Sequence, residues 1–173
     1  MLSATGRKYL RGPRGTGFLY VRRDLIEPLE PPFLDLHAAT WVAKDRYEIR
    51  ADARRFENWE TYYAGKIGLG VAVDYALAWG LDTIWARVSH LDSSLRTRLQ
   101  DIPRVHVQDL GVQKCGIVTF TIHGCSSQDI HSKLAGQKMN VSISSTASTR
   151  LDMDSRGLAS VVRASVHYYN TEE

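Results

Sequence analysis

Lys8 comes directly before a turn that is both basic and rich in glycine. Residues 6–23 read GRKYLRGPRGTGFLYVRR. The free backbone N–H groups of such a turn, beside Arg7, Arg11 and Arg14, can hold an anion. The spacing matches neither a P-loop nor a dinucleotide-binding fingerprint, because we predict no strand before the turn and no helix after it. From the residues alone, an anion site and a solvated basic loop both stay open.

The region after this turn is predicted to be helical. Apolar residues recur at helical spacing through residues 60–79, where several glycines either weaken the helix or mark close packing. Gly80 is expected to end this helix. Asp82 is expected to cap a second helix, which carries one apolar stripe to about residue 100.

Beyond Pro103 the apolar period changes to two, which is typical of half-buried strands. A short capped helix interrupts the strands, and an irregular loop precedes the last of them. The sequence therefore predicts an α+β module built on one sheet. Its strands are expected around residues 105–107, 118–122, 141–143 and 162–166, with the helix at 126–137 and the loop at 144–159.

Composition indicates an ordinary globular chain of 173 residues, 43% hydrophobic, with a net charge of +3. The two cysteines, Cys115 and Cys125, show no metal or disulfide spacing, which favours a reducing cytoplasm. The histidines also lack metal-ligand spacing, so we expect no metal site. No membrane partner is expected, because no apolar run approaches a membrane span. No nucleic-acid partner is expected either, because acidic residues follow the basic cluster at once and no aromatic ladder accompanies it.

Three ordered segments resemble the class V aminotransferase family of pyridoxal phosphate (PLP) enzymes, which includes the cysteine desulfurases. They are the lysine segment 3–22, the ARRFE segment 53–57, and the C-terminal segment VVRASVHYYNTEE at 161–173. The branch that they resemble most contains isopenicillin N epimerase-like and C–S lyase-like proteins. The resemblance implies an α/β fold. The chain would be the C-terminal part of a fold-type I PLP enzyme, with the end of the large domain, a connecting helix and a small α+β domain.

The resemblance implies that Lys8 is the catalytic lysine and carries the cofactor. A lysine amine bonds to the cofactor aldehyde, is displaced by an incoming amino acid, and is then placed to move the Cα proton. Ser3, Thr5 and Arg7 are implied as further cofactor-binding residues. Arg7 stands where relatives commonly have histidine.

Arg163 matches the family arginine that binds the substrate carboxylate. Its guanidinium group can meet a carboxylate with two parallel hydrogen bonds, which would fix the orientation of the substrate. In many relatives a glycine–threonine pair after the RFE segment reaches the phosphate of the neighbouring subunit. Here Asn58-Trp59-Glu60-Thr61 takes its place, and Thr61 is the implied substitute. Trp59 either lines a site or fills a core.

Several expectations about function follow from the resemblance. Desulfurases of the family carry a nucleophilic cysteine on the loop before the VRAS strand, and residues 144–159 contain none. Cysteine desulfurase activity is therefore disfavoured, whereas epimerase, C–S lyase and aminotransferase chemistry stay open. We expect a fragment (residues 1–79 from the large domain, 80–173 the small domain) that is inactive alone. The intact enzyme would be a homodimer acting on an amino acid; the alternative is a non-catalytic interaction module.

Overall fold

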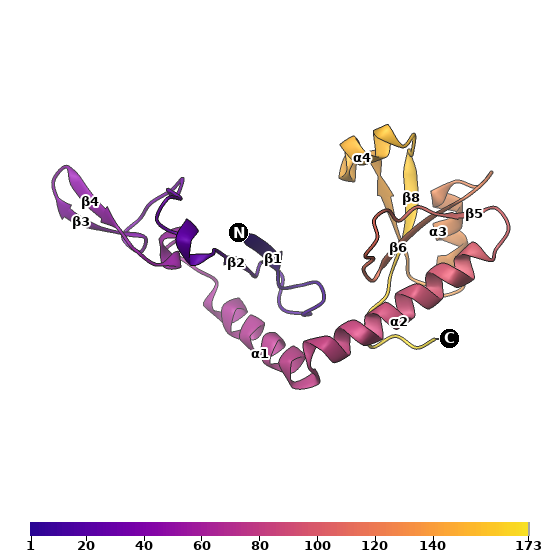
Figure 1. Cartoon of the computed structure of the whole chain (residues 1–173), viewed down its shortest axis with the longest axis horizontal. Coiled ribbons are helices and arrows are strands. Elements are labelled where there is room, and N and C mark those ends of the chain that lie inside the picture. Colours follow the sequence, from indigo (N-terminus) through magenta and orange to yellow (C-terminus); the bar gives the residue numbers. More distant parts are fainter. Residues whose placement is uncertain (173) are drawn as a thin grey trace. The chain divides into compact units, whose positions relative to one another are not determined.

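The computed structural model describes residues 1–172, which fold as two compact units (Figure 1). The first unit is Met1–Ala78, and the second begins at Trp79. The assignment of these parts to a large and a small domain of a longer enzyme stays a prediction. Glu173, the last residue of the C-terminal motif, lies outside the described residues.

The first unit contains two antiparallel hairpins and all but the last residue of the helix α1 (Tyr63–Trp79). In the first hairpin, β1 (Leu2–Thr5) pairs with β2 (Gly17–Tyr20), and the turn that carries Lys8 connects them. The expectation that no strand precedes this turn is therefore wrong, because the four residues of β1, LSAT, form too short a pattern to indicate a strand. The second hairpin pairs β3 (Ala39–Ala43) with β4 (Arg46–Ile49).

Glycines in α1 allow the lysine turn to pack closely against this helix. A Cβ atom added at Gly65 would lie 2.9 Å from Cγ2 of Thr16, and one at Gly68 would lie 2.8 Å from Cγ of Pro13. Of the two interpretations that the sequence left open, a weakened helix or close packing, the structure favours close packing for these two glycines. The packing of α1 against the turn holds the turn in place.

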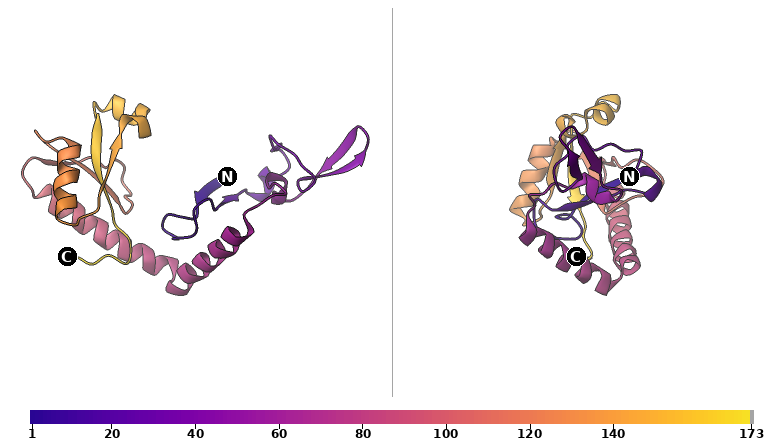
Figure 2. Two further views of the ribbon diagram at one scale, coloured as in Figure 1. Left: turned by 180° about the vertical axis from the view of Figure 1, so that it is seen from behind. Right: turned by 90° about the vertical axis from the view of Figure 1, so that its left-hand side faces the viewer.

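The second unit is an antiparallel sheet with helices packed against it (Figure 2). The strand order is β5-β6-β8-β7, and the core contains Val105, Phe120, Ile130 and Val162. The predicted strands and the capped helix occur where the apolar pattern placed them. The elements are α2 (Leu81–Gln100), β5 (Val105–Val107), β6 (Ile117–Ile122), α3 (Ser127–Gly136), β7 (Ser142–Ser145), α4 (Arg150–Ser155) and β8 (Ser160–Ser165).

Two local expectations in this unit are wrong. Asp82 does not cap α2 but lies in its first turn, and the N-cap position is occupied by Gly80, with φ of 83°, which ends α1 as predicted. Residues 144–159 are not irregular throughout, because Thr146–Ser148 form a 3-10 helix and Arg150–Ser155 form α4. The many Ser, Thr and Asp residues of this segment obscured the short helices, since they favour caps and turns.

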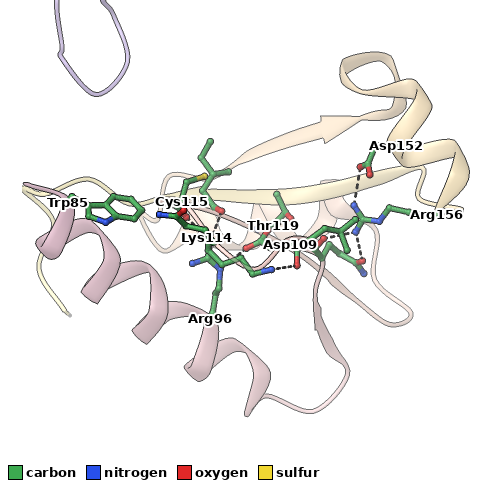
Figure 3. A pocket seen from close by; sticks show the side chains of 12 residues that line it. Trp85, Arg96, Asp109, Lys114, Cys115, Thr119, Asp152 and Arg156 are labelled. Carbon is green, nitrogen blue, oxygen red and sulfur yellow. Dashed lines mark hydrogen bonds and ion pairs between the residues drawn. The ribbon is translucent and has the colours of Figure 1, made fainter. Parts of the chain in front are cut away.

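A buried arginine joins α2 to the sheet (Figure 3). Arg96 donates from Nη1 to Asp92 Oδ1 at 2.6 Å and from Nε to Asp109 Oδ2 at 2.8 Å. Its Nη2 donates to the carbonyl oxygens of Cys115 and Ile117. Asp109 in turn accepts from the backbone N–H of Thr119 in β6 at 2.8 Å. The guanidinium group therefore binds the helix, the loop after β5 and β6 together.

We expect Arg96→Ala to lower the free energy of unfolding by about 3–5 kcal/mol, because removing one member of a buried ion-pair network leaves uncompensated charge. Chemical denaturation would measure the change. Arg150→Ala is the matched control, since Arg150 makes only an exposed pair with Asp154 at 3.5 Å. Equal stability of the two variants would show that the Arg96 network does not hold α2 on the sheet.

No single helix among the described residues is long and apolar enough to cross a membrane. The broken pair α1 and α2 meets the criterion together, by length and composition only.

Candidate functional site

A cavity of about 1170 Å³ in the first unit brings together three of the predicted cofactor-binding residues. Ser3 and Thr5 line it from β1, and Thr61 lines it from the segment before α1. Thr16 adds a further hydroxyl, which donates to the carbonyl oxygen of Pro13 at 2.6 Å. The cavity also has basic side chains and an aromatic wall, formed by Arg54, Lys66, Phe18, Phe56, Trp59, Tyr62 and Tyr63.

Lys8 and Arg7 do not line this cavity. Lys8 lies on the turn just after β1, with its side chain exposed, and its carbonyl oxygen accepts from the N–H of Arg11 at 2.9 Å. The turn is closed by a bond from the N–H of Gly12 to the carbonyl oxygen of Gly6, at 2.8 Å. The backbone of the lysine is thus fixed. The roles of both residues stay predictions.

The Arg163 side chain lies on β8, in the second unit. It is half-buried, and among residues 1–172 it has no hydrogen bond or ion pair. Its neighbours across the sheet are Thr119 in β6 and Ser142 in β7. Because side chains alternate along a strand, Arg163 points away from the face on which Val162 is buried. An unpaired guanidinium group in this position is available to a carboxylate, and the predicted role stays a prediction.

Trp59 lines the cavity and is 59% exposed, so it does not fill a core. Its backbone N–H donates to Asp35 Oδ2 at 2.7 Å. Asp35 Oδ1 accepts from the N–H groups of His37 and Ala38 at 2.8 and 3.1 Å. The bond from Trp59 is the largest cause that lowers the pKa of Asp35 below its ordinary value of 3.8. The Asp35 carboxylate therefore joins the segment of His37 to the segment of Trp59, and both of these residues line the cavity.

The lowered pKa of Asp35 predicts that the hydrogen bonds of its carboxylate to the backbone of His37 and Trp59 weaken in acid. A carboxyl group whose pKa is lower in the folded chain than in the unfolded chain stabilises the fold at any pH above its unfolded-state pKa. This stabilisation is lost as the pH falls through the folded-state pKa. We expect Trp59 emission to change as the pH falls below 3.8, the ordinary value. Asp35→Asn should show the acid-type emission already at neutral pH.

Subtracting the spectrum of Trp59→Phe isolates the signal of this tryptophan from those of the others. Asp45→Asn, on the exposed turn between β3 and β4, is the control. An Asp35→Asn spectrum that matches the wild type at neutral pH would refute the role of the Asp35 carboxylate.

Sequence reasoning missed the pair of His37 and Glu57, which also lines this cavity. Nε2 of His37 lies 3.1 Å from Oε2 of Glu57. The two residues are 20 positions apart, so no local spacing indicates the pair. Within residues 1–172, no group of three or more His, Cys, Asp and Glu side chains is placed to hold a metal ion.

The two cysteines are free and exposed. Cys115 lines a second cavity, of about 640 Å³, in the second unit beside Arg96 and Lys114 (Figure 3). Cys125 follows β6, and its N–H donates to the carbonyl oxygen of Ile122 at 3.0 Å. Neither cysteine lies on the segment 144–159 before β8.

Comparison with known proteins shows the family of the chain. The model of the family "Aminotransferase class-V" matches residues 1–173, so the chain belongs to this family. The PLP cofactor implied by the sequence is confirmed at the level of the family. The predicted α/β, fold-type I architecture is also confirmed.

Curated relatives from this family are named cysteine desulfurases. A probable cysteine desulfurase from Methanothermobacter thermautotrophicus is 30% identical over 97% of this chain and 43% of its own length. Another, from Xylella fastidiosa strain Temecula1, is 32% identical over 98% of this chain and 40% of its own length. The chain thus spans about two fifths of the length of these relatives.

A solved structure shows the same fold. The cysteine desulfurase CsdA from Escherichia coli superposes with a TM-score of 0.85 at 22% identity, over 98% of this chain and 42% of its own. At this identity the likeness supports the fold and no finer statement.

The relatives overturn one prediction from the sequence. Cysteine desulfurase activity was disfavoured because residues 144–159 lack a cysteine, yet similarity along nearly the whole chain is to cysteine desulfurases. The prediction of epimerase, C–S lyase or aminotransferase chemistry in an inactive fragment, with an interaction module as alternative, is therefore wrong. One missing side chain in one loop weighs less than similarity over the entire chain, because a thiol can come from another position.

The cavity in the first unit fits the phosphate group of PLP. Hydroxyl groups are suitable donors to phosphate oxygens, and Ser3, Thr5 and Thr61 all face one space. Lys66 adds positive charge to the same lining. Lys8 follows β1 by three residues, so the strand that supplies two hydroxyls also fixes the lysine turn.

Proposed function

We propose that this chain is the C-terminal part of a PLP-dependent cysteine desulfurase. The observation that carries the proposal is the similarity to curated cysteine desulfurases over 97–98% of the chain. The cavity lined by hydroxyl groups supports it, because it offers donors for a phosphate next to the lysine turn.

The proposed roles are those that the resemblance implies, and the shared cavity supports them for Ser3, Thr5 and Thr61. Ser3 and Thr5 hold the cofactor phosphate. Thr61 lines the same cavity and is proposed to join them, in place of the contact with the neighbouring subunit's phosphate that the resemblance implies. Arg163 binds the carboxylate of the substrate cysteine. PLP, when bound, supplies an electron-withdrawing ring that stabilises negative charge at the substrate Cα. The Lys8 amine carries the cofactor and moves the Cα proton once substrate has displaced it.

The proposed overall reaction moves one sulfur atom from cysteine to an acceptor thiol. The C–S bond of cysteine breaks, its carbon gains a hydrogen to give alanine, and the acceptor R–SH becomes the persulfide R–SSH. The acceptor is a thiol of the enzyme or of a second molecule. Cys115 and Cys125 are the thiols that this chain itself offers, and both are exposed.

Partners and location belong to the same proposal. A homodimer and a cytoplasmic location, both expected from the sequence, are retained as proposals. Two free cysteines agree with a reducing compartment.

Product analysis tests the proposed function. The PLP-loaded protein is given L-cysteine with dithiothreitol as acceptor, and alanine and sulfide are measured. We expect equal amounts of alanine and sulfide over many turnovers. Release of pyruvate and ammonia in place of alanine would contradict desulfuration and indicate elimination, and absence of any turnover of cysteine would contradict the proposal as a whole.

A further inference from the structure

The His37–Glu57 pair lies in the same cavity as the hydroxyl groups assigned to the phosphate. His37 precedes β3, and Glu57 follows the short 3-10 helix Ala53–Phe56. Their side chains are 32% and 46% exposed. Both therefore reach the cavity while keeping their contact with each other, at 3.1 Å.

Asp35 fixes the backbone of His37, and Glu57 and Trp59 contact its ring. Asp35 accepts from the backbone N–H of His37 and, with its other oxygen, from that of Trp59. The rings of His37 and Trp59 meet edge to face, with centroids 6.3 Å apart and planes at 86°. A ring on a fixed backbone, in contact with a carboxylate and an aromatic neighbour, is preorganised, which is what a group acting on a ligand requires.

The contact with Glu57 sets the chemistry of the ring. Because a carboxylate only accepts hydrogen bonds, Nε2 of His37 carries a hydrogen and donates it to Glu57. In the neutral form of the ring, Nδ1 then holds a lone pair. Among residues 1–172 it has no hydrogen-bond partner, so it can accept a proton from a ligand.

We propose that His37, oriented by Glu57, is the proton acceptor for the thiol of the substrate. This inference rests on the proposed function, which makes a thiol amino acid the substrate. The S–H proton moves to Nδ1, the hydrogen on Nε2 stays shared with Glu57, and the products are a thiolate and an imidazolium paired with a carboxylate. Glu57 stabilises the charge that forms on the ring.

Comparing two substrates tests the role of His37. In the holoenzyme, His37→Gln should lower kcat/KM for L-cysteine by about 10²-fold, at the lower end of what positioned proton transfer contributes. L-selenocysteine carries a selenol that is already ionised near neutral pH, so the variant should lose far less with this substrate. Glu57→Gln should give a smaller loss in the same direction. The control is His106→Gln, an exposed histidine on β5.

A substrate-independent loss in His37→Gln would mean that the ring has only a structural role, and wild-type rates with cysteine would exclude any role. Unfolding midpoints and the absorbance of bound PLP show whether each variant is folded and loaded. If His37→Gln does not fold, the role of the pair is tested with Glu57→Gln, by comparing its kcat/KM for L-cysteine with that for L-selenocysteine.

Nuclear magnetic resonance of the imidazole nitrogens separates this inference from the proposed function. Without ligand, the spectrum of the full chain should show hydrogen on Nε2 of His37 and none on Nδ1. L-cysteine should shift the Nδ1 resonance, whereas L-alanine, which lacks the thiol, should not. If the holoenzyme releases no sulfur from cysteine, the proposed function fails, and the shift still decides whether His37 meets a thiol. If sulfur is released and the resonance does not move, the inference alone fails.

Discussion

Replacing Lys8 by arginine should abolish measurable turnover of cysteine while leaving the fold intact. A guanidinium group keeps the positive charge but cannot condense with the cofactor aldehyde or move the Cα proton. Loss of proton transfer alone costs about 10²–10⁴-fold, and loss of the covalent attachment adds to this. The backbone of the turn does not depend on the lysine side chain, because it is closed by the bond from Gly12 to Gly6. We therefore expect the unfolding midpoint to be unchanged.

The assignment of the lysine is checked chemically as well as kinetically. Borohydride reduction of the holoenzyme fixes the pyridoxyl group to the lysine that carries it, and peptide mapping then identifies this residue. We expect the label on Lys8. Lys44→Arg, on the exposed turn between β3 and β4, is the control and should retain full activity. Label on Lys44 or Lys66 would overturn the assignment, and so would full activity of Lys8→Arg.

Elements with a long apolar period could be predicted from the sequence. The four strands of the second unit, with α2 and α3, carry side chains that alternate or recur because one face of each is buried around Phe120 and Val162. The hairpin of β3 and β4 has no such signal. Its cross-strand partners Trp41 and Tyr47 are 68% and 55% exposed, so burial imposes no alternation on them.

Only those candidate site residues that belong to a recognisable motif could be named from the sequence. Ser3, Thr5 and Thr61 were assigned from the resemblance, and the structure places all three on one cavity. His37 and Glu57 could not be found in this way. They meet because Asp35 binds the backbone of both segments, and such a tertiary contact leaves no local pattern.

The error on the reaction has a related cause. The absence of a cysteine from residues 144–159 was used to reject one chemistry, although the acceptor thiol is a chemical requirement and not a fixed position. Similarity to cysteine desulfurases extends over 97–98% of the chain. The absence of a thiol from one loop therefore does not decide the reaction.

Arg163→Ala should weaken the binding of the transition state by about 2–5 kcal/mol, the range for removing one side of a desolvated charged pair. This corresponds to a loss of about 30- to 5000-fold in kcat/KM for cysteine. The loss is expected because Arg163 is half-buried on β8 and, among the described residues, has no carboxylate partner of its own. Arg163→Lys keeps the charge but not the two parallel hydrogen bonds, so it should recover only part of the loss.

Cysteamine, which lacks the carboxylate of cysteine, shows whether this loss arises from carboxylate binding. The wild type and Arg163→Ala should have equal, low kcat/KM for cysteamine, because the arginine has nothing to bind in that substrate. Arg150→Ala removes an exposed arginine from α4 and should leave kcat/KM for cysteine unchanged. If Arg163→Ala loses as much with cysteamine as with cysteine, Arg163 supports the sheet and does not bind the substrate carboxylate. If it loses nothing with cysteine, the carboxylate is held elsewhere, and the resemblance at the VRAS segment reflects the fold alone.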